Sequence, residues 1–172
     1  MKKQMTKIVM MLILVTGLSA GVAEAQIDVG FYTGVETSPG TCEAITSVCY
    51  GNTFVLNSSG EWETHYLTLS LDYVNVPNHN GSGMGITGGN WSLVVFRDNQ
   101  YFGTLYGRVE TGNIIVITDY TKDEDGSRQV QATLVSTGGF GPFTEYKKIH
   151  GELSVISDLR SGETKGTASF NF

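Results

Sequence analysis

A two-residue alternation of apolar and polar side chains is the feature that most constrains this chain. Over residues 67–76 the two kinds of side chain fall on opposite sides of an extended backbone. One side carries Leu67, Leu69, Leu71 and Tyr73, and the other carries Thr68, Ser70 and Asp72. Such a segment is typical of a β-strand with one face in a core and the other in solvent.

Similar short runs recur along the chain with Gly, Asn and Asp between them. They span residues 30–36, 49–56, 91–96, 101–109, 114–119, 129–136, 149–156 and 164–172. The composition of residues 97–100, 111–113 and 122–126 predicts hairpin turns. No segment keeps a helical period for the roughly 10–12 residues that a helix needs. We therefore expect eight or nine sequential antiparallel strands in one domain, as a barrel or a sandwich.

Glycines inside the expected strands distinguish between these two architectures. Gly103, Gly107, Gly151 and Gly166 all interrupt strand patterns. Glycine within a strand marks a bulge, a tight bend or a barrel corner. The sequence therefore predicts an all-β fold, a single-domain, eight-stranded antiparallel β-barrel.

The first residues have the three parts of a secretory signal peptide. Lys2, Lys3 and Lys7 precede a wholly apolar run over residues 8–15, and Ala23-Glu24-Ala25 supplies small residues for cleavage. The apolar run is shorter than the roughly 20 residues of a membrane span. We expect residues 1–25 to be removed and residues 26–172 to form an exported domain, periplasmic or extracellular.

The expected mature domain is acidic. Cleavage after Ala25 would reduce the basic residues from 11 to 8 and the acidic residues from 17 to 16, so the net charge would change from −6 to −8. A nucleic-acid ligand requires clustered Lys and Arg, and only Lys147 and Lys148 are adjacent in this domain. We therefore expect no nucleic-acid partner.

The two cysteines, Cys42 and Cys49, are close in sequence, and an exported domain is exposed to oxidising conditions. A disulfide is the first interpretation, and two buried thiols are the alternative. No histidine or second cysteine pair has zinc-ligand spacing around them. We predict a Cys42–Cys49 disulfide, no metal and no cofactor.

Three segments, over residues 88–93, 103–107 and 132–143, resemble allene oxide cyclase and dirigent-like barrels. The clearest likeness is Gly138-Gly139-Phe140-Gly141-Pro142-Phe143, although that family has Thr at the position of Phe140. The resemblance covers about the C-terminal half. It implies an eight-stranded antiparallel barrel that holds a small apolar or phenolic molecule in its mouth and steers its cyclisation or coupling. No catalytic residue of the family matches a residue here, so the catalytic residues are unknown and enzymatic activity stays open.

Aromatic residues are the candidates for a ligand pocket, because a ring supplies apolar area and a phenol adds a polar group. We expect Tyr66, Trp91, Tyr101 and Tyr106 to line it. Packing in the core is the alternative. An eight-stranded barrel is wide enough either to be filled by side chains or to hold one small ligand.

Glu61, Glu63 and His65 would share one face of a strand, with Trp62 and Tyr66 on the other. A Glu beside a His is able to transfer protons. The more common arrangement is an exposed polar face over an aromatic inner one, which is our expectation here. No nucleophile accompanies any of the histidines in a motif.

Two further patterns look like ligand motifs. The glycines of residues 83–88 match a dinucleotide fingerprint, but a strand follows where a helix is required, so we expect a long loop. The carboxylates of residues 119–125 lack the spacing of a calcium-binding loop and predict a solvated hairpin tip.

Two other functions stay open. Alternating Ala168, Phe170 and Phe172 would suit the last strand of an outer-membrane barrel, whereas the apolar run over residues 114–117 would not suit a polar lumen. A carbohydrate-binding module would use exposed Trp and Tyr to stack on sugars. The oligomeric state also stays open, and the resemblance implies a homo-oligomer as one option, because related barrels often pair or trimerise through their outer faces.

Overall fold

The computed structural model describes residues 30–43, 48–78, 81–118 and 126–172. The predicted signal peptide over residues 1–25 lies outside this part of the chain, as do the acidic residues 119–125. The predictions about them are therefore untested.

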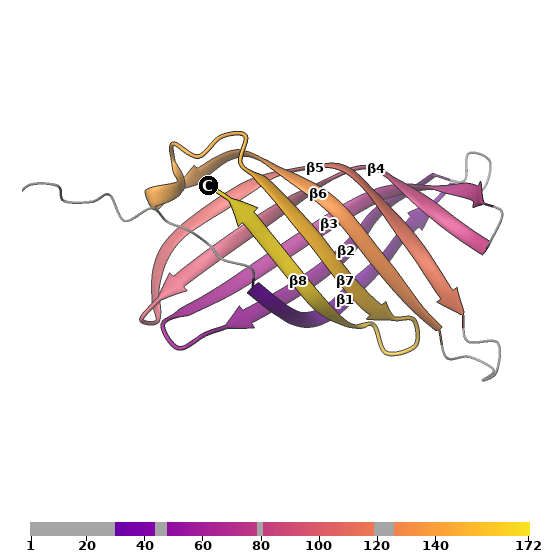
Figure 1. Ribbon diagram of the computed structural model, residues 1–172, viewed down its shortest axis with the longest axis horizontal. Coiled ribbons are helices and arrows are strands. Elements are labelled where there is room, and N and C mark those ends of the chain that lie inside the picture. The colour runs from indigo at the N-terminus through magenta and orange to yellow at the C-terminus, as the bar shows by residue number, and fades with distance from the viewer. Residues whose placement is uncertain (1–29, 44–47, 79–80, 119–125) are drawn as a thin grey trace, which may run out of the picture.

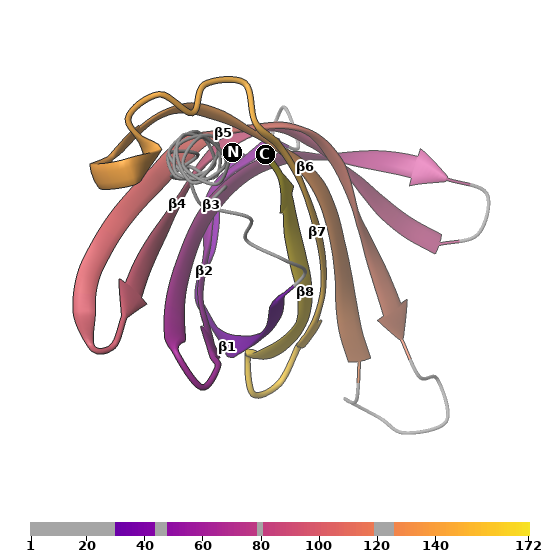
Figure 2. The same ribbon diagram turned by 60° about the vertical axis from the view of Figure 1, so that its left-hand side comes forward.

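Eight antiparallel strands close into one barrel, as the sequence predicts (Figures 1 and 2). The strands, with one short 3-10 helix, are β1 (Gly30–Cys42), β2 (Val48–Ser59), β3 (Glu63–Asn78), β4 (Gly81–Arg97), β5 (Gln100–Thr118), β6 (Gly126–Phe140), η1 (Gly141–Phe143), β7 (His150–Asp158) and β8 (Glu163–Asn171). Each strand pairs with the next along the chain, and β8 pairs with β1 to close the barrel.

Alternation places an apolar core inside the barrel. On β3, Leu67, Leu69, Leu71 and Tyr73 are buried, whereas Thr68 between them is exposed. Inward side chains from all the other strands join them. Examples are Phe54 and Leu56 on β2, Trp91 and Leu93 on β4, Leu105 and Ile114 on β5, Val130 and Leu134 on β6, and Phe170 on β8. Burying this apolar surface is the main driving force for closing the sheet.

The two ends of the barrel differ. The η1 end carries the β2–β3 and β4–β5 turns, η1 and the C-terminal Phe172, which packs against Phe143 and Tyr146. The disulfide end carries the β7–β8 turn and the predicted bond between Cys42 and Cys49, which face each other on β1 and β2. A disulfide is typical of proteins in an oxidising environment.

Two predicted connections are wrong. The expected turn at residues 111–113 lies within β5, and the expected loop over residues 83–88 is part of β4, which forms a hairpin with β3. Gly112 does not form a turn but lets β5 and β6 approach closely, because a Cβ there would lie 2.2 Å from the Gln131 carbonyl oxygen. Gly and Asn are ambiguous in sequence because turns and crowded strands both favour small or adaptable residues.

The predicted turn at residues 97–100 is confirmed. Asp98 and Asn99 connect β4 to β5 with φ angles of 49° and 60°. Two consecutive residues in the left-handed region match the twist of a two-residue hairpin, and Asp and Asn tolerate this conformation.

Candidate functional site

The four aromatic residues predicted to line a pocket do not surround one interior space. Trp91 is buried in the barrel, where its Nε1 donates to the Arg108 carbonyl oxygen at 3.0 Å. Tyr66, Tyr101 and Tyr106 lie on the outer surface. The outward position of Tyr66 and Tyr106 was predictable from the sequence. Each is adjacent to a leucine, Leu67 or Leu105, that points inward, and neighbouring residues of a strand point to opposite faces.

A polar cluster lies inside the barrel near the disulfide end. We call it the mouth cluster, and it consists of Glu36, Asn52, Arg128, Ser157 and Thr164. Asn52 Nδ2 donates to Glu36 Oε1 at 2.6 Å, and Arg128 Nη1 donates to the same oxygen at 3.0 Å. Ser157 Oγ donates to Glu36 Oε2 at 3.3 Å and lies 3.0 Å from Thr164 Oγ1.

Two polar atoms of this cluster have no hydrogen-bond partner among the described residues. They are the acceptor Asn52 Oδ1 and the donor Arg128 Nε. The orientation of the Asn52 amide follows from its surroundings, because Nδ2 donates to both Glu36 Oε1 and the Ser38 carbonyl oxygen. Buried polar atoms almost always have partners, so these two atoms stand out as having unused hydrogen-bonding capacity.

Sequence reasoning missed the mouth cluster although its positions held a signal. Arg128 shares its strand face with Val130, Ala132 and Leu134, all of which are buried. A charged residue in phase with an apolar face is a candidate for a buried ion pair. Its partner Glu36 lies 92 residues away in the sequence, so only the closed barrel identifies the pair.

A second polar network lies at the η1 end. Glu63 accepts hydrogen bonds from Arg97 Nε and, at 3.0 Å, from His65 Nε2. Because the carboxylate only accepts, Nε2 carries the proton in the neutral ring, and Nδ1 accepts from the hydroxyl of Tyr32 at 3.2 Å. The Arg97 guanidinium also stacks 3.6 Å from the centroid of Phe102.

The surroundings shift two pKa values in this network. Burial, reinforced by the nearby charge of Glu63, raises the pKa of the Tyr32 hydroxyl well above its usual value. Partial burial alone would raise the pKa of Glu63, but hydrogen bonds and charges from His65 and Arg97 together lower it. The network therefore favours a neutral tyrosine and an ionised glutamate.

The expected orientation of this strand segment is reversed in part. Glu63 and His65 belong to the inward network, whereas Tyr66, expected inside, is exposed. Glu61 and Trp62 precede β3 and lie in the turn. The reversal has a physical reason: the buried Leu67 and Leu69 determine which face of β3 points inward, and Glu63 and His65 share that face.

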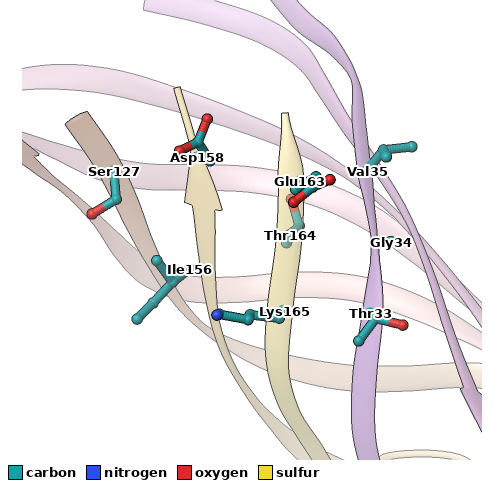
Figure 3. A pocket seen from close by; sticks show the side chains of 9 residues that line it. All are labelled: Thr33, Gly34, Val35, Ser127, Ile156, Asp158, Glu163, Thr164 and Lys165. Atoms are coloured by element: carbon teal, nitrogen blue, oxygen red, sulfur yellow. The ribbon is translucent and has the colours of Figure 1, made fainter. Parts of the chain in front are cut away.

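The outer surface has a hollow of about 600 Å³ over β1, β6, β7 and β8 (Figure 3). Its lining comprises Thr33, Gly34, Val35, Ser127, Ile156, Asp158, Glu163, Thr164 and Lys165. In the part of the chain that the structure describes, no ion pair joins Asp158, Glu163 or Lys165 to one another. Hydrogen bonds from Ser161 and the Arg160 backbone lower the pKa of Asp158.

Neither metal ligation nor a membrane-spanning helix is found in the part of the chain that the structure describes. There, no three His, Cys, Asp or Glu side chains are grouped closely enough to hold a metal ion. No helix in these ranges is long and apolar enough to cross a membrane. Comparison with known proteins found no matching family model, characterised protein or solved structure.

Proposed function

We propose that this protein is exported and binds a small apolar molecule bearing one hydroxyl group, such as a phenol, at the disulfide-end mouth of the barrel. The observation that carries the proposal is the pair of unpartnered atoms in the mouth cluster, Asn52 Oδ1 and Arg128 Nε. Asn52 Nδ2 and Arg128 Nη1 both donate to Glu36 Oε1, so the two side chains that carry these atoms are neighbours.

A hydroxyl group suits these two atoms because it donates one hydrogen bond and accepts another. It would donate to Asn52 Oδ1 and accept from Arg128 Nε. A carboxylate would face the negative charge of Glu36 and the acceptor Oδ1, and an amine would have no lone pair for Nε once protonated. The cluster therefore favours a neutral hydroxyl.

The apolar part of the molecule would contact the inner wall beside the cluster. Phe54 pairs with Glu36 across β1 and β2, Leu71 pairs with Asn52 across β2 and β3, and Val130 follows Arg128 on the same face of β6. All three side chains are buried. A few placed polar groups in an apolar wall are typical of small-molecule sites.

The distribution of side chains supports a barrel surrounded by water more than an outer-membrane barrel. The interior is mainly apolar apart from the two polar networks, and the outward positions include Thr68, Arg108, Glu152 and Lys165, all of them exposed. An outer-membrane barrel has the opposite arrangement, with an apolar outer band and a polar interior. The disulfide supports export to an oxidising compartment, and the resemblance to allene oxide cyclase and dirigent-like barrels supports a ligand in the mouth.

Titration with 2-naphthol and naphthalene, followed by fluorescence, tests this proposal. We expect 2-naphthol to bind at least about tenfold more tightly, which corresponds to one net hydrogen bond. Arg128→Lys retains the positive charge beside Glu36 but removes Nε, so it should abolish most of this preference. Ser154→Ala, on the outward face of β7, is the matched control.

Circular dichroism would establish that both variants keep the barrel. Equal affinity for the two probes, no binding of either, or an undiminished preference in folded Arg128→Lys would each overturn the proposal. Native mass spectrometry of the purified protein would then identify the natural ligand by its mass.

A further inference from the structure

Four exposed aromatic residues and one half-buried one gather on the outer surface of β3–β6 near the η1 end. We call this set the outer aromatic face, and it consists of Tyr66 on β3, Phe96 on β4, Tyr101 and Tyr106 on β5, and Phe140 at the end of β6. Tyr101 is 54% exposed and Phe140 61% exposed. Soluble proteins seldom leave such rings together on the surface without a role in binding.

Strand register shows that these residues form one continuous surface. Tyr66 lies opposite Val94, Val94 opposite Thr104, and Thr104 opposite Phe140, so one row crosses four strands. At the usual separation of neighbouring strands this row is roughly 14 Å long. The other members, Phe96, Tyr101 and Tyr106, lie in the rows directly beside it.

The rings hold one another in place. Phe96 makes edge-on contacts with Tyr66 and Tyr101, with centroids 5.8 and 6.1 Å apart. The hydroxyl of Tyr101 lies 3.0 Å from Thr104 Oγ1. Rings with few rotatable bonds that are already packed lose little conformational entropy when they bind a ligand.

Tyr106 lies across Gly138 on the neighbouring strand. A Cβ at Gly138 would lie only 2.6 Å from the Tyr106 hydroxyl oxygen and 2.9 Å from the ring carbon that bears it. The absence of a side chain at Gly138 therefore lets the ring lie against β6. The centroid of Phe140 is 5.6 Å from that of Tyr106, which extends the aromatic surface.

The outer aromatic face has no charged side chain among its members, although the protein as a whole is acidic. The residues paired with its members across the strands are Asn57, Thr64, Ser92, Val94, Thr104 and Gly138, and none of them is charged. The whole chain has a net charge of −6. That charge repels polyanions and disfavours a second copy of the chain, but it does not act on an uncharged ligand.

We infer that the outer aromatic face binds a neutral polysaccharide. The ring faces would pack against the apolar C–H faces of pyranose sugars, whose slightly positive hydrogens are attracted by the negative ring face. The hydroxyls of Tyr66, Tyr101 and Thr104 would bond sugar hydroxyls. This site is independent of the mouth cluster and of any ligand held there.

Native gels that contain hydroxyethylcellulose, xyloglucan or galactomannan test the inference by slowing a bound protein. We expect at least one of these neutral polysaccharides to slow the protein and alginate to have no effect. Tyr106→Ala and Phe140→Ala should each weaken binding about tenfold, whereas Tyr106→Phe should retain most of it. Phe31→Ala removes an aromatic residue that is 60% exposed on β1, away from the face, and should bind as the unmodified protein does.

Far-UV circular dichroism and thermal melting would verify the fold of each variant. The inference fails if no neutral polysaccharide slows the protein, or if folded Tyr106→Ala and Phe140→Ala bind normally. It also fails if light scattering shows a dimer that these two variants dissociate, because a second copy would then cover the face.

Discussion

Glu36 and Arg128 form an ion pair within the barrel, with side chains that are only 10% and 14% exposed. Removing both charges from water opposes their attraction, so such a pair adds little stability relative to apolar residues of similar size. Removing one partner is different, because the other charge then stays buried without compensation. The two single substitutions and the double substitution should therefore differ in their effect on stability.

A double-mutant cycle tests this account of the pair. Arg128→Met should lower the free energy of unfolding by about 3 kcal/mol, because Glu36 keeps a buried charge without its partner. Adding Glu36→Gln should restore a substantial part of that loss. Urea denaturation measures all four proteins, and strictly additive losses would contradict the coupling.

At the scale of the strand pair, close approach between backbones requires glycine at certain inward positions. A Cβ at Gly166 on β8 would lie 2.1 Å from the Ser154 carbonyl oxygen and 2.6 Å from the Val155 Cα on β7. Both atoms belong to the backbone, so a methyl group there would force the strands apart. The sequence-based interpretation of in-strand glycines as signs of barrel curvature agrees with this crowding.

Gly166→Ala should therefore destabilise the barrel by about 2 kcal/mol or more, as overpacking of a crowded site does. Gly88→Ala on β4 is the matched control, because a Cβ there would meet only the Asp72 side chain, at 3.8 Å. We expect the control to change stability by less than about 0.5 kcal/mol. Chemical denaturation of both variants measures the difference, and equal losses would exclude backbone crowding as the cause.

For the molecule as a whole, we expect the network at the η1 end to make the free energy of unfolding depend on pH. The pKa of Glu63 is lowered on folding, so its contribution is present above its ordinary value of 4.5 and is lost as the pH falls below it. The pKa of Tyr32 is raised on folding, so its contribution is present below its ordinary value of 10.0 and is lost as the pH rises above it.

Melting temperatures measured from about pH 3 to about pH 11 test these two limits. Glu63→Gln should flatten the acid limb of the profile, and Tyr32→Phe should flatten the alkaline limb. Each variant should leave the opposite limb largely as it was. A Tyr32→Phe profile that falls at high pH as steeply as the parent profile would show that other groups set the alkaline limit.

By itself, the sequence determined the local features of this protein: the strand alternation seen in residues 67–76, the Asp98-Asn99 turn and the closeness along the chain of the two cysteines that form the disulfide. These depend on neighbours along the chain, which periodicity and turn chemistry report directly. The outward placement of Tyr66, the merging of two predicted strands into β5 and the pairing of Glu36 with Arg128 were decided by the tertiary structure. Closure of the barrel selects which strand face is buried and brings together residues far apart in the chain, and no local pattern encodes those contacts.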